Sequence, residues 1–175
     1  MRIIIVALLI TMLFSLLFAT YDKDIDHLIS DAENGDMEAQ YILGLSYYRG
    51  EGVEAVYWLE QAANQGDADA QYYLGVSYAK GDGVEKNSKQ AVYWYEKAAN
   101  QGQADAQNNL GVCYEFGKGV VQNYQTAYFW YLLASANGIE KAKDNMDRIA
   151  QDLSPSQQIE IQNRATRWFE NNNGR

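Results

Sequence analysis

The residue types that most often carry catalysis or bind metals are scarce in this chain. His27 is the only histidine and Cys113 the only cysteine, so a histidine-based dyad or a cluster of soft metal ligands has few members to draw on. The closest carboxylate pair between units, Asp67 and Asp69, stands where a helix is expected to begin, and negative charge there offsets the helix dipole. The Gly-x-Gly pairs lack the third glycine and the preceding strand of a phosphate-binding loop. We therefore predict no catalytic residues, no metal and no cofactor.

The lone histidine and the lone thiol are both interpreted as structural or surface residues. A single cysteine cannot form an internal disulfide, so stability must come from packing alone. Cys113 lies within a predicted helix among apolar neighbours, and we expect a buried small hydrophobe, the alternative being a disulfide to a partner. His27 is expected to be a packed or surface histidine.

Composition and charge narrow the classes of partner. With 175 residues and 47% hydrophobic side chains, the chain suits one domain with a substantial core. Its 14 basic and 23 acidic residues give a formal charge of −9. This balance repels phosphate backbones and anionic lipid headgroups, so nucleic acid is excluded as an expected partner. It favours a basic protein partner, although acidity can also serve solubility alone.

The first nineteen residues differ from all that follows. Arg2 precedes a run of 17 residues without charge, Ile3 to Ala19, and polar sequence begins at Tyr21. This order is typical of a secretory signal peptide, which we place at residues 1–19. Because the run is near the lower limit for spanning a bilayer, a retained N-terminal anchor is the alternative. We therefore expect a periplasmic or secreted protein, or one anchored in the inner membrane and facing the periplasm.

A repeated pattern occupies the centre of the chain. Each copy has an Ala-Gln-x-x-Leu-Gly segment, a Gly-x-Gly-Val turn, an aromatic residue followed by tryptophan, and an alanine-rich segment ending in glycine. The copies begin at Ala39, Ala70 and Ala106, their turns begin at Gly50, Gly81 and Gly117, and their tryptophans are Trp58, Trp94 and Trp130. The tryptophans are 36 residues apart both times, which indicates a tandem array of one structural unit.

Each unit is predicted to be two antiparallel helices. In the second unit Ala70, Leu74 and Tyr78 share one stripe at helical spacing, with Gly75 beside them. A glycine in the middle of a helix costs about 1 kcal/mol relative to alanine. Its repetition at one phase therefore predicts a close approach of the second helix.

The turns and caps distinguish the first unit from the others. A Gly-x-Gly pair breaks the first helix, and Asn87 and Asn123 can cap the second helices of the later units. The first unit is five residues short between Gly52 and Trp58 and lacks the capping asparagine. We expect its second helix to start late and fray, leaving a groove near Val53 that is either neutral drift or part of a partner site.

The repeat resembles the Sel1-like repeat, a relative of the tetratricopeptide repeat. The second unit, Ala70 to Gly102, matches the pattern almost throughout, and the resemblance covers Ala39 to Gly138. It implies an all-α, right-handed α-solenoid of stacked antiparallel helix pairs with a concave face. Residues 25–35 resemble the second helix of a preceding unit and 142–147 the first helix of a following one. We place the solenoid at residues 20–153.

Residues 154–175 are predicted to form a C-terminal capping helix and tail. Ser154 and Gln157 form a capping box, with Pro155 at the first helical position. Such a helix covers the open hydrophobic end of a stack, the alternative being a docking helix for another molecule. Its apolar stripe consists of Ile161, Ala165, Trp168 and Phe169.

Function is expected on first-helix positions that face away from the shared stripe and differ between units, because stacking would join them into one strip. These positions are Ile42, Ser46 and Arg49 in the first unit, Tyr73, Ser77 and Lys80 in the second, and Asn109, Cys113 and Phe116 in the third. Exposed tyrosine and arginine are frequent at binding hot spots. We expect the main contacts with a protein partner from Arg49, Tyr73, Lys80 and Phe116.

These observations favour a non-enzymatic adaptor or scaffold in the cell envelope that binds another protein through its concave face. Family resemblance leaves open an inhibitor or immunity protein that neutralises a toxic enzyme in the periplasm. An enzyme acting on the cell wall ranks last, for want of acid, base or metal ligands. No small-molecule substrate is expected, and a membrane is expected as a partner only if residues 1–19 are retained.

Overall fold

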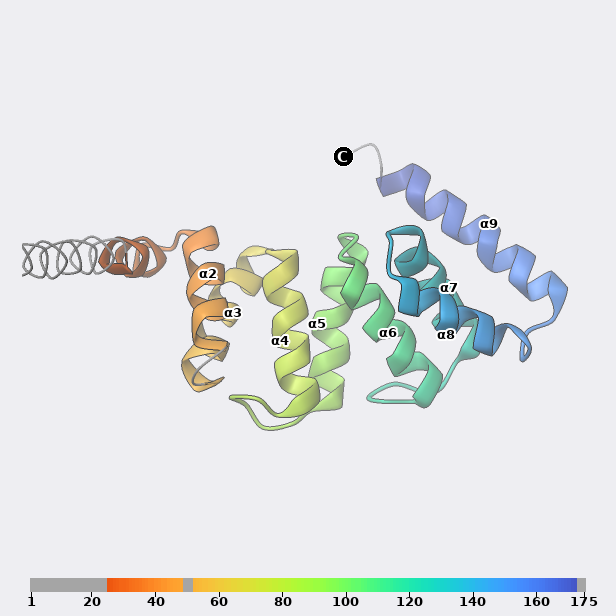
Figure 1. Ribbon diagram of the computed structural model, residues 1–175, viewed down its shortest axis with the longest axis horizontal. Coiled ribbons are helices and arrows are strands. Elements are labelled where there is room, and N and C mark those ends of the chain that lie inside the picture. Colours follow the sequence, from red (N-terminus) through yellow and green to blue (C-terminus); the bar gives the residue numbers. More distant parts are fainter. Residues whose placement is uncertain (1–24, 49–51, 173–175) are drawn as a thin grey trace, which may run out of the picture.

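The computed structural model describes residues 25–48 and 52–172, and every regular element in these ranges is helical (Figure 1). A short helix over 25–33 is followed by α2 (Met37–Tyr48), α3 (Gly52–Gln65), α4 (Ala68–Lys80), α5 (Ser88–Asn100), α6 (Ala104–Phe116), α7 (Tyr124–Ala136), α8 (Glu140–Ala150) and α9 (Pro155–Asn172). None of the helices in the described ranges is long and apolar enough to cross a membrane. The predicted signal peptide or anchor lies outside them.

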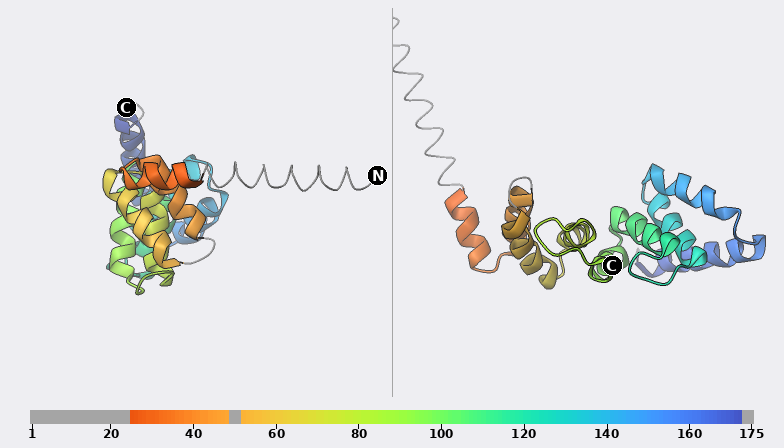
Figure 2. Two further views of the ribbon diagram at one scale, coloured as in Figure 1. Left: turned by 90° about the vertical axis from the view of Figure 1, so that its left-hand side faces the viewer. Right: turned by 90° about the horizontal axis from the view of Figure 1, so that it is seen from below.

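The helices pair in chain order, and the pairs stack along the long axis of the molecule (Figures 1 and 2). Each first helix packs on the second helix of its own unit, as α4 does on α5, and each second helix packs on the first helix of the next unit. Each unit therefore buries apolar surface both between its own two helices and against the neighbouring units. The predicted all-α solenoid is confirmed.

The repeated mid-helix glycines lie against the second helix of their own unit, as predicted. A Cβ atom added to Gly75 would lie 2.6 Å from the ring of Tyr95, and one added to Gly111 would lie 2.6 Å from the ring of Tyr131. Both distances are shorter than any ordinary contact between carbon atoms. Close helix packing is thus the gain that offsets the poor helix propensity of glycine.

Gly111→Ala is expected to lower the free energy of unfolding by about 1–2 kcal/mol, because the added methyl group overlaps the fully buried ring of Tyr131. Better helix propensity offsets only part of this cost. Ser46→Ala is the control, since this helical position is exposed and already carries a Cβ atom, so alanine adds no overlap there. Urea denaturation followed by circular dichroism compares the two, and an equal loss in both variants would contradict the argument.

The turns of the second and third units carry the predicted signals. Gly81 and Gly83 have φ values of +89° and +72°, a region that glycine enters without strain. The side chain of Asn87 accepts two backbone N–H groups of the first turn of α5, and Asn123 accepts one in α7. The predicted asparagine caps are confirmed.

The prediction for the shortened first unit is wrong. Helix α3 already begins at Gly52 and has 14 residues, against 13 in α5 and in α7. Trp58 is the seventh residue of α3, as Trp94 is of α5, so the helices correspond from their first residue. The missing residues therefore shorten the connecting loop and not the helix. The Val53 side chain, where a groove was expected, is outside the described residues.

The tryptophans join neighbouring units. Trp94 is buried in a cluster with Leu59 and Ala63 of α3 and Leu74 of α4, so it connects the second unit to the first. Trp130 is buried in the same way further along the stack. Trp58 is only half-buried, and within the described residues the short helix 25–33 is the one element that precedes its unit.

A ladder of glutamine side chains also links the units, and the sequence reasoning missed it. Buried Gln71 donates from Nε2 to the carbonyl oxygen of Ala63 at 3.0 Å, and its Oε1 accepts from Gln101 at 2.8 Å. Gln40 and Gln107 make equivalent bonds in the other units. Glutamine follows alanine at the same position in all three copies, and this recurrence was the signal from which the ladder could have been predicted.

Helices α8 and α9 close the C-terminal end. Helix α8 packs on α7 like the first helix of a further unit, with Ala142 fully buried. Helix α9 lies back against α7 and buries Ile161 and Ala165 (Figure 1). The predicted capping box is confirmed, since the Ser154 backbone N–H donates to Gln157 Oε1 at 2.8 Å.

Candidate functional site

The side chains with reactive potential do not converge. Within residues 25–48 and 52–172, no group of three or more His, Cys, Asp and Glu side chains is placed to hold a metal ion. His27 is exposed on the helix 25–33. Asp67 caps α4 by accepting the backbone N–H of Ala70 at 2.6 Å, which agrees with its predicted place at a helix start. These groups have structural or solvent-facing positions.

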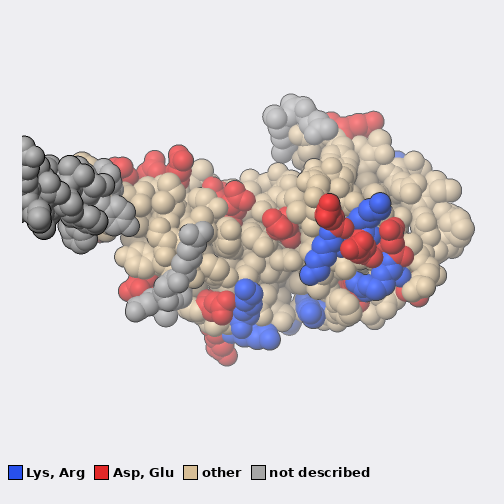
Figure 3. Space-filling view, in the orientation of Figure 1, with Lys and Arg blue, Asp and Glu red and all other residues tan. Residues whose placement is uncertain are grey.

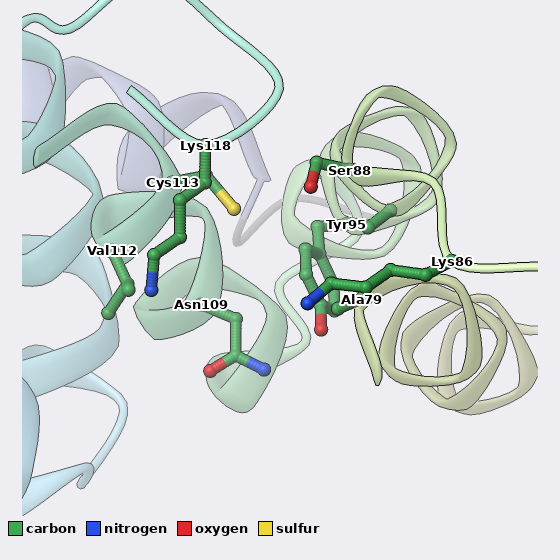
Figure 4. Close-up of a pocket in the computed structure, with 9 residues that line it drawn as sticks. Ala79, Lys86, Ser88, Tyr95, Asn109, Val112, Cys113 and Lys118 are labelled. Atoms are coloured by element: carbon green, nitrogen blue, oxygen red, sulfur yellow. The ribbon is translucent and has the colours of Figure 1, made fainter. Parts of the chain in front are cut away.

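A cleft of about 360 Å³ lies between the second and third units (Figure 4). Lys86 and Ser88 lie on one side of it, and Asn109, Cys113 and Lys118 lie on the other. Its lining contains no histidine and no carboxylate that could serve as a base for the thiol. The cleft therefore presents contact surface and not a paired nucleophile and base.

Cys113 is expected to react slowly with iodoacetamide in the folded protein. The side chain is buried, as predicted, and burial raises the pKa of the thiol to about 11, with Lys118 acting to lower it and Glu96 to raise it. Little thiolate, the reactive form, is then present at a pH of about 8. Labelling followed by mass spectrometry should be more than about ten-fold slower than for the chain unfolded in urea. Similar rates in the two states would contradict this prediction.

The positions predicted to bind a partner differ in their exposure. Ile42 and Phe116 are 40% and 55% exposed, and Lys80 is exposed at the end of α4. Tyr73 and Asn109 are partly buried. Arg49 lies outside the described residues. A partner therefore has access to all the described positions of this set apart from the one discussed next.

The prediction that Ser77 faces a partner is wrong. Its side chain is fully buried, and its Oγ has no hydrogen-bond partner. Cys113, at the equivalent position of the third unit, is also buried, whereas Ser46 in the first unit is exposed. A first helix inside the stack is covered by the second helix of its own unit and by the second helix of the preceding unit. More of its circumference is therefore buried than the apolar stripe of one helix indicates.

Four tyrosines of α2 and α4 form one cluster, the tyrosine patch: Tyr41, Tyr48, Tyr72 and Tyr73. Tyr73 is at its centre, with ring centroids 6.3 Å from Tyr41, 5.6 Å from Tyr48 and 5.1 Å from Tyr72. All four side chains remain partly exposed. Of these four residues, only Tyr73 was predicted to bind a partner. Tyr41 and Tyr72 occupy the same position in successive repeats, and this recurrence was the signal that could have revealed the patch.

The tyrosine patch ends at the third unit. Asn108 and Asn109 stand there in place of the Tyr72–Tyr73 pair. Asn108 is buried, and its Oδ1 accepts from the amide of Asn145 in α8 at 3.2 Å. Aromatic contact surface on the first helices is thus concentrated in the first two units.

Phe116 marks a second exposed aromatic site, at the end of α6. The Lys118 ammonium lies 5.3 Å and the Arg148 guanidinium 5.8 Å from its ring centroid, within cation–π range. Arg148 also pairs through both terminal nitrogens with the buried carboxylate of Glu115, which accepts the Tyr131 hydroxyl at 2.6 Å. The surroundings of Phe116 are therefore held in place by an ion pair whose carboxylate is buried.

Charge is distributed unevenly along the solenoid. Residues 25–79 contain ten acidic side chains against the single Arg49, whereas residues 80–175 contain eleven of each sign. The view in Figure 3 shows the same division, with blue side chains gathered over the C-terminal half and red ones alone over the N-terminal part. The whole net charge of the folded region therefore resides in the part that carries the tyrosine patch.

A protein-family model described as the Sel1 repeat matches residues 38–67, 68–103 and 104–139, which together make up more than half of the chain. The boundaries coincide with the helix pairs α2–α3, α4–α5 and α6–α7 to within a few residues. No curated protein is significantly similar to the chain.

Solved structures with the same architecture include three from bacteria. A protective antigen present in uropathogenic Escherichia coli strains, with an SLR fold, is 34% identical at a TM-score of 0.78, over 85% of this chain and 33% of its own. A Sel1 repeat protein from Oxalobacter formigenes is 41% identical at a TM-score of 0.65, and the match covers 72% of this chain and 98% of that protein. Cysteine rich protein B of Helicobacter pylori is 26% identical at a TM-score of 0.57, and the match covers 70% of this chain and 92% of that protein. The chain thus spans about a third of the length of the first of these proteins.

Proposed function

Because the chain belongs to the Sel1 repeat family, whose repeats are protein-binding modules, we propose that it is an adaptor in the cell envelope that holds another protein on its first-helix face. The carrying observation is the tyrosine patch, a cluster of four partly exposed rings shared by two neighbouring units. Tyrosine combines a large apolar face with a hydroxyl group and is enriched at protein interfaces for that reason.

The first helices supply the rest of the proposed surface. Ile42 is exposed on α2 and follows Tyr41 in the chain, while Lys80 and Phe116 lie at the ends of α4 and α6. In a solenoid the equivalent helices of successive units form one continuous face. A partner segment can therefore reach Ile42, Tyr73 and Phe116 along a single path, which supports three of the positions expected from the sequence.

The envelope location rests on the N-terminal segment. We propose that residues 1–19 direct export and are removed after Ala19, so that the solenoid works in the periplasm or outside the cell. N-terminal sequencing of the protein recovered from the periplasm tests this part. A chain that begins at residue 20 supports removal, and an intact Met1 would show that the segment is kept as an anchor.

Affinity capture of the tagged chain from its own compartment, followed by mass spectrometry, tests the function. The Tyr73→Ala, Phe116→Ala double variant is expected to lose at least about ten-fold in affinity for the captured protein, since two accessible aromatic anchors contribute about 1.4 kcal/mol or more together. Val121→Ala with Ile159→Ala is the matched control, because these apolar residues are 87% and 58% exposed outside the first-helix face.

Two outcomes would overturn the proposal. Either no protein binds the wild-type chain, or binding persists in the Tyr73→Ala, Phe116→Ala variant while its melting temperature is unchanged. If the captured protein is an enzyme that loses activity in the complex, the chain is an inhibitor and not an adaptor. An enzyme assay on the purified complex makes that distinction.

A further inference from the structure

The rings of the tyrosine patch pack against one another and remain partly exposed. Tyr48 and Tyr72 meet Tyr73 at interplanar angles of 60° and 63°, edge to face, while Tyr41 lies at 38° to it. Rings in such mutual contact have little freedom to turn when a ligand binds. The patch is thus a preformed aromatic surface, and the face of an aromatic ring carries negative electrostatic potential that attracts cations.

Carboxylates lie beside this surface, since Asp69 stands four residues before Tyr73 on the same face of α4. Burial raises the pKa of the Tyr41 phenol to about 12, and the charges of Asp69, Tyr73 and Asp67 add to the rise. Burial likewise raises the pKa of Tyr72 to about 12, with a further contribution from Asp105. The phenols therefore stay neutral at physiological pH, in a region of negative potential that favours an incoming positive charge.

Elsewhere in the described chain, several aromatic rings have a cation of their own. Arg164 lies 3.9 Å from the ring centroid of Phe129, and Lys97 lies 5.0 Å from that of Tyr93. Phe116 has both Lys118 and Arg148. Across residues 25–48 and 52–172, no such contact involves the four rings of the tyrosine patch. In the described part of residues 25–79 there is no lysine or arginine that could provide one.

We propose that the tyrosine patch, with the carboxylates of Asp67 and Asp69 beside it, binds an arginine-containing segment of the partner protein. This inference rests on the proposed function and specifies the chemistry of the partner. Arginine fits better than lysine, because its planar guanidinium stacks on aromatic faces while its N–H groups bond carboxylates in pairs. The excess of acidic residues in 25–79 attracts the same segment over a longer range.

Isothermal titration calorimetry with a defined probe tests this inference. The probe is a capped eight-residue peptide that alternates glycine and arginine, compared with peptides that carry glutamine or glutamate in place of arginine. Only the arginine peptide is expected to bind. The Tyr41→Leu, Tyr73→Leu variant should bind it about ten-fold more weakly, because each lost ring removes one cation–π contact.

The control must separate ring contacts from general attraction to an acidic protein. Tyr57→Leu with Tyr93→Leu removes two exposed tyrosines from second helices without changing net charge, and should alter affinity less than two-fold. A second pair compares Asp69→Asn, expected to weaken binding several-fold, with Asp144→Asn at the far end of the molecule. Circular dichroism confirms that each variant is folded, and the aspartate pair leaves the rings in place should the leucine variant unfold.

The inference would be overturned if each test variant and its control weakened peptide binding equally, or if neither weakened it. Tighter binding of the glutamate peptide than of the arginine peptide would also overturn it. Failure of this inference can be told apart from failure of the proposed adaptor function. If the wild-type chain and its Tyr41→Leu, Tyr73→Leu variant capture the same protein equally well, protein binding stands and the assignment of an arginine site fails. If the wild-type chain captures no protein, the adaptor function fails instead.

Discussion

Trp94→Ala is expected to lower the free energy of unfolding by about 3–5 kcal/mol, which is a large part of the roughly 5–15 kcal/mol typical of a domain. The indole is 7% exposed and fills space between its own unit and the preceding one, so its removal leaves a cavity at the junction of two repeats. In a solenoid each unit depends on contact with its neighbours, and no other element can fill that space. Urea denaturation followed by far-ultraviolet circular dichroism measures the loss.

Tyr93→Ala is the matched control for this variant. Tyr93 is the adjacent residue on the same helix, but 47% of it is exposed and its ring contacts Lys97 and Trp94 at the surface. Its removal should cost no more than about 1 kcal/mol. A loss of less than about 1.5 kcal/mol in Trp94→Ala, or equal losses in the two variants, would show that the tryptophans do not join the units.

Arg148→Met should lower the free energy of unfolding by about 2 kcal/mol, because it leaves the carboxylate of Glu115 buried without its positive partner. Glu115 is 3% exposed, while the Arg148 side chain is about half exposed, so the cost is below that of a fully buried pair. Methionine keeps most of the length of the arginine chain, which separates the loss of charge from the loss of packing.

A double-mutant cycle with Glu115→Gln checks the reason for this loss. Glutamine removes the charge but keeps an oxygen that can accept the hydroxyl of Tyr131, which Glu115 now accepts at 2.6 Å. If the buried charge causes the cost, the double variant loses clearly less than the sum of the two single variants. Strictly additive losses would mean that Arg148 stabilises α8 by packing alone.

The order of the helices could be predicted from the sequence because the units repeat the same local residue pattern. Gly75 and Gly111 predicted close helix contact, and the structure shows a tyrosine ring against each of them. Asn87 and Asn123 predicted the starts of α5 and α7. The caps depend on residues a few positions apart, and the glycine contacts join the two helices of one unit, so both are encoded within a single repeat.

The first unit departs from the other two in the length of its loop, and there the repeat pattern predicted the wrong helix start. The five residues missing from the first unit appeared to remove the start of a helix, because the capping asparagine is among them. The structure shows that α3 keeps its phase from Gly52 and that the connecting loop shortened instead. Packing of Leu59 and Trp58 against their neighbours holds the helix in register even without the cap.

The sequence by itself determined the fold class, the glycine contacts, the caps and the positions of the tryptophans, since all of them follow from a repeated local pattern. Only the tertiary structure decided that Ser77 is buried, that tyrosines from two units form one patch, and that Glu115, Tyr131 and Arg148 share a charge network. The members of each of these groups come from different helices or are covered by them. Their environment depends on how the units stack, and periodicity within one helix carries no information about what a neighbouring helix covers.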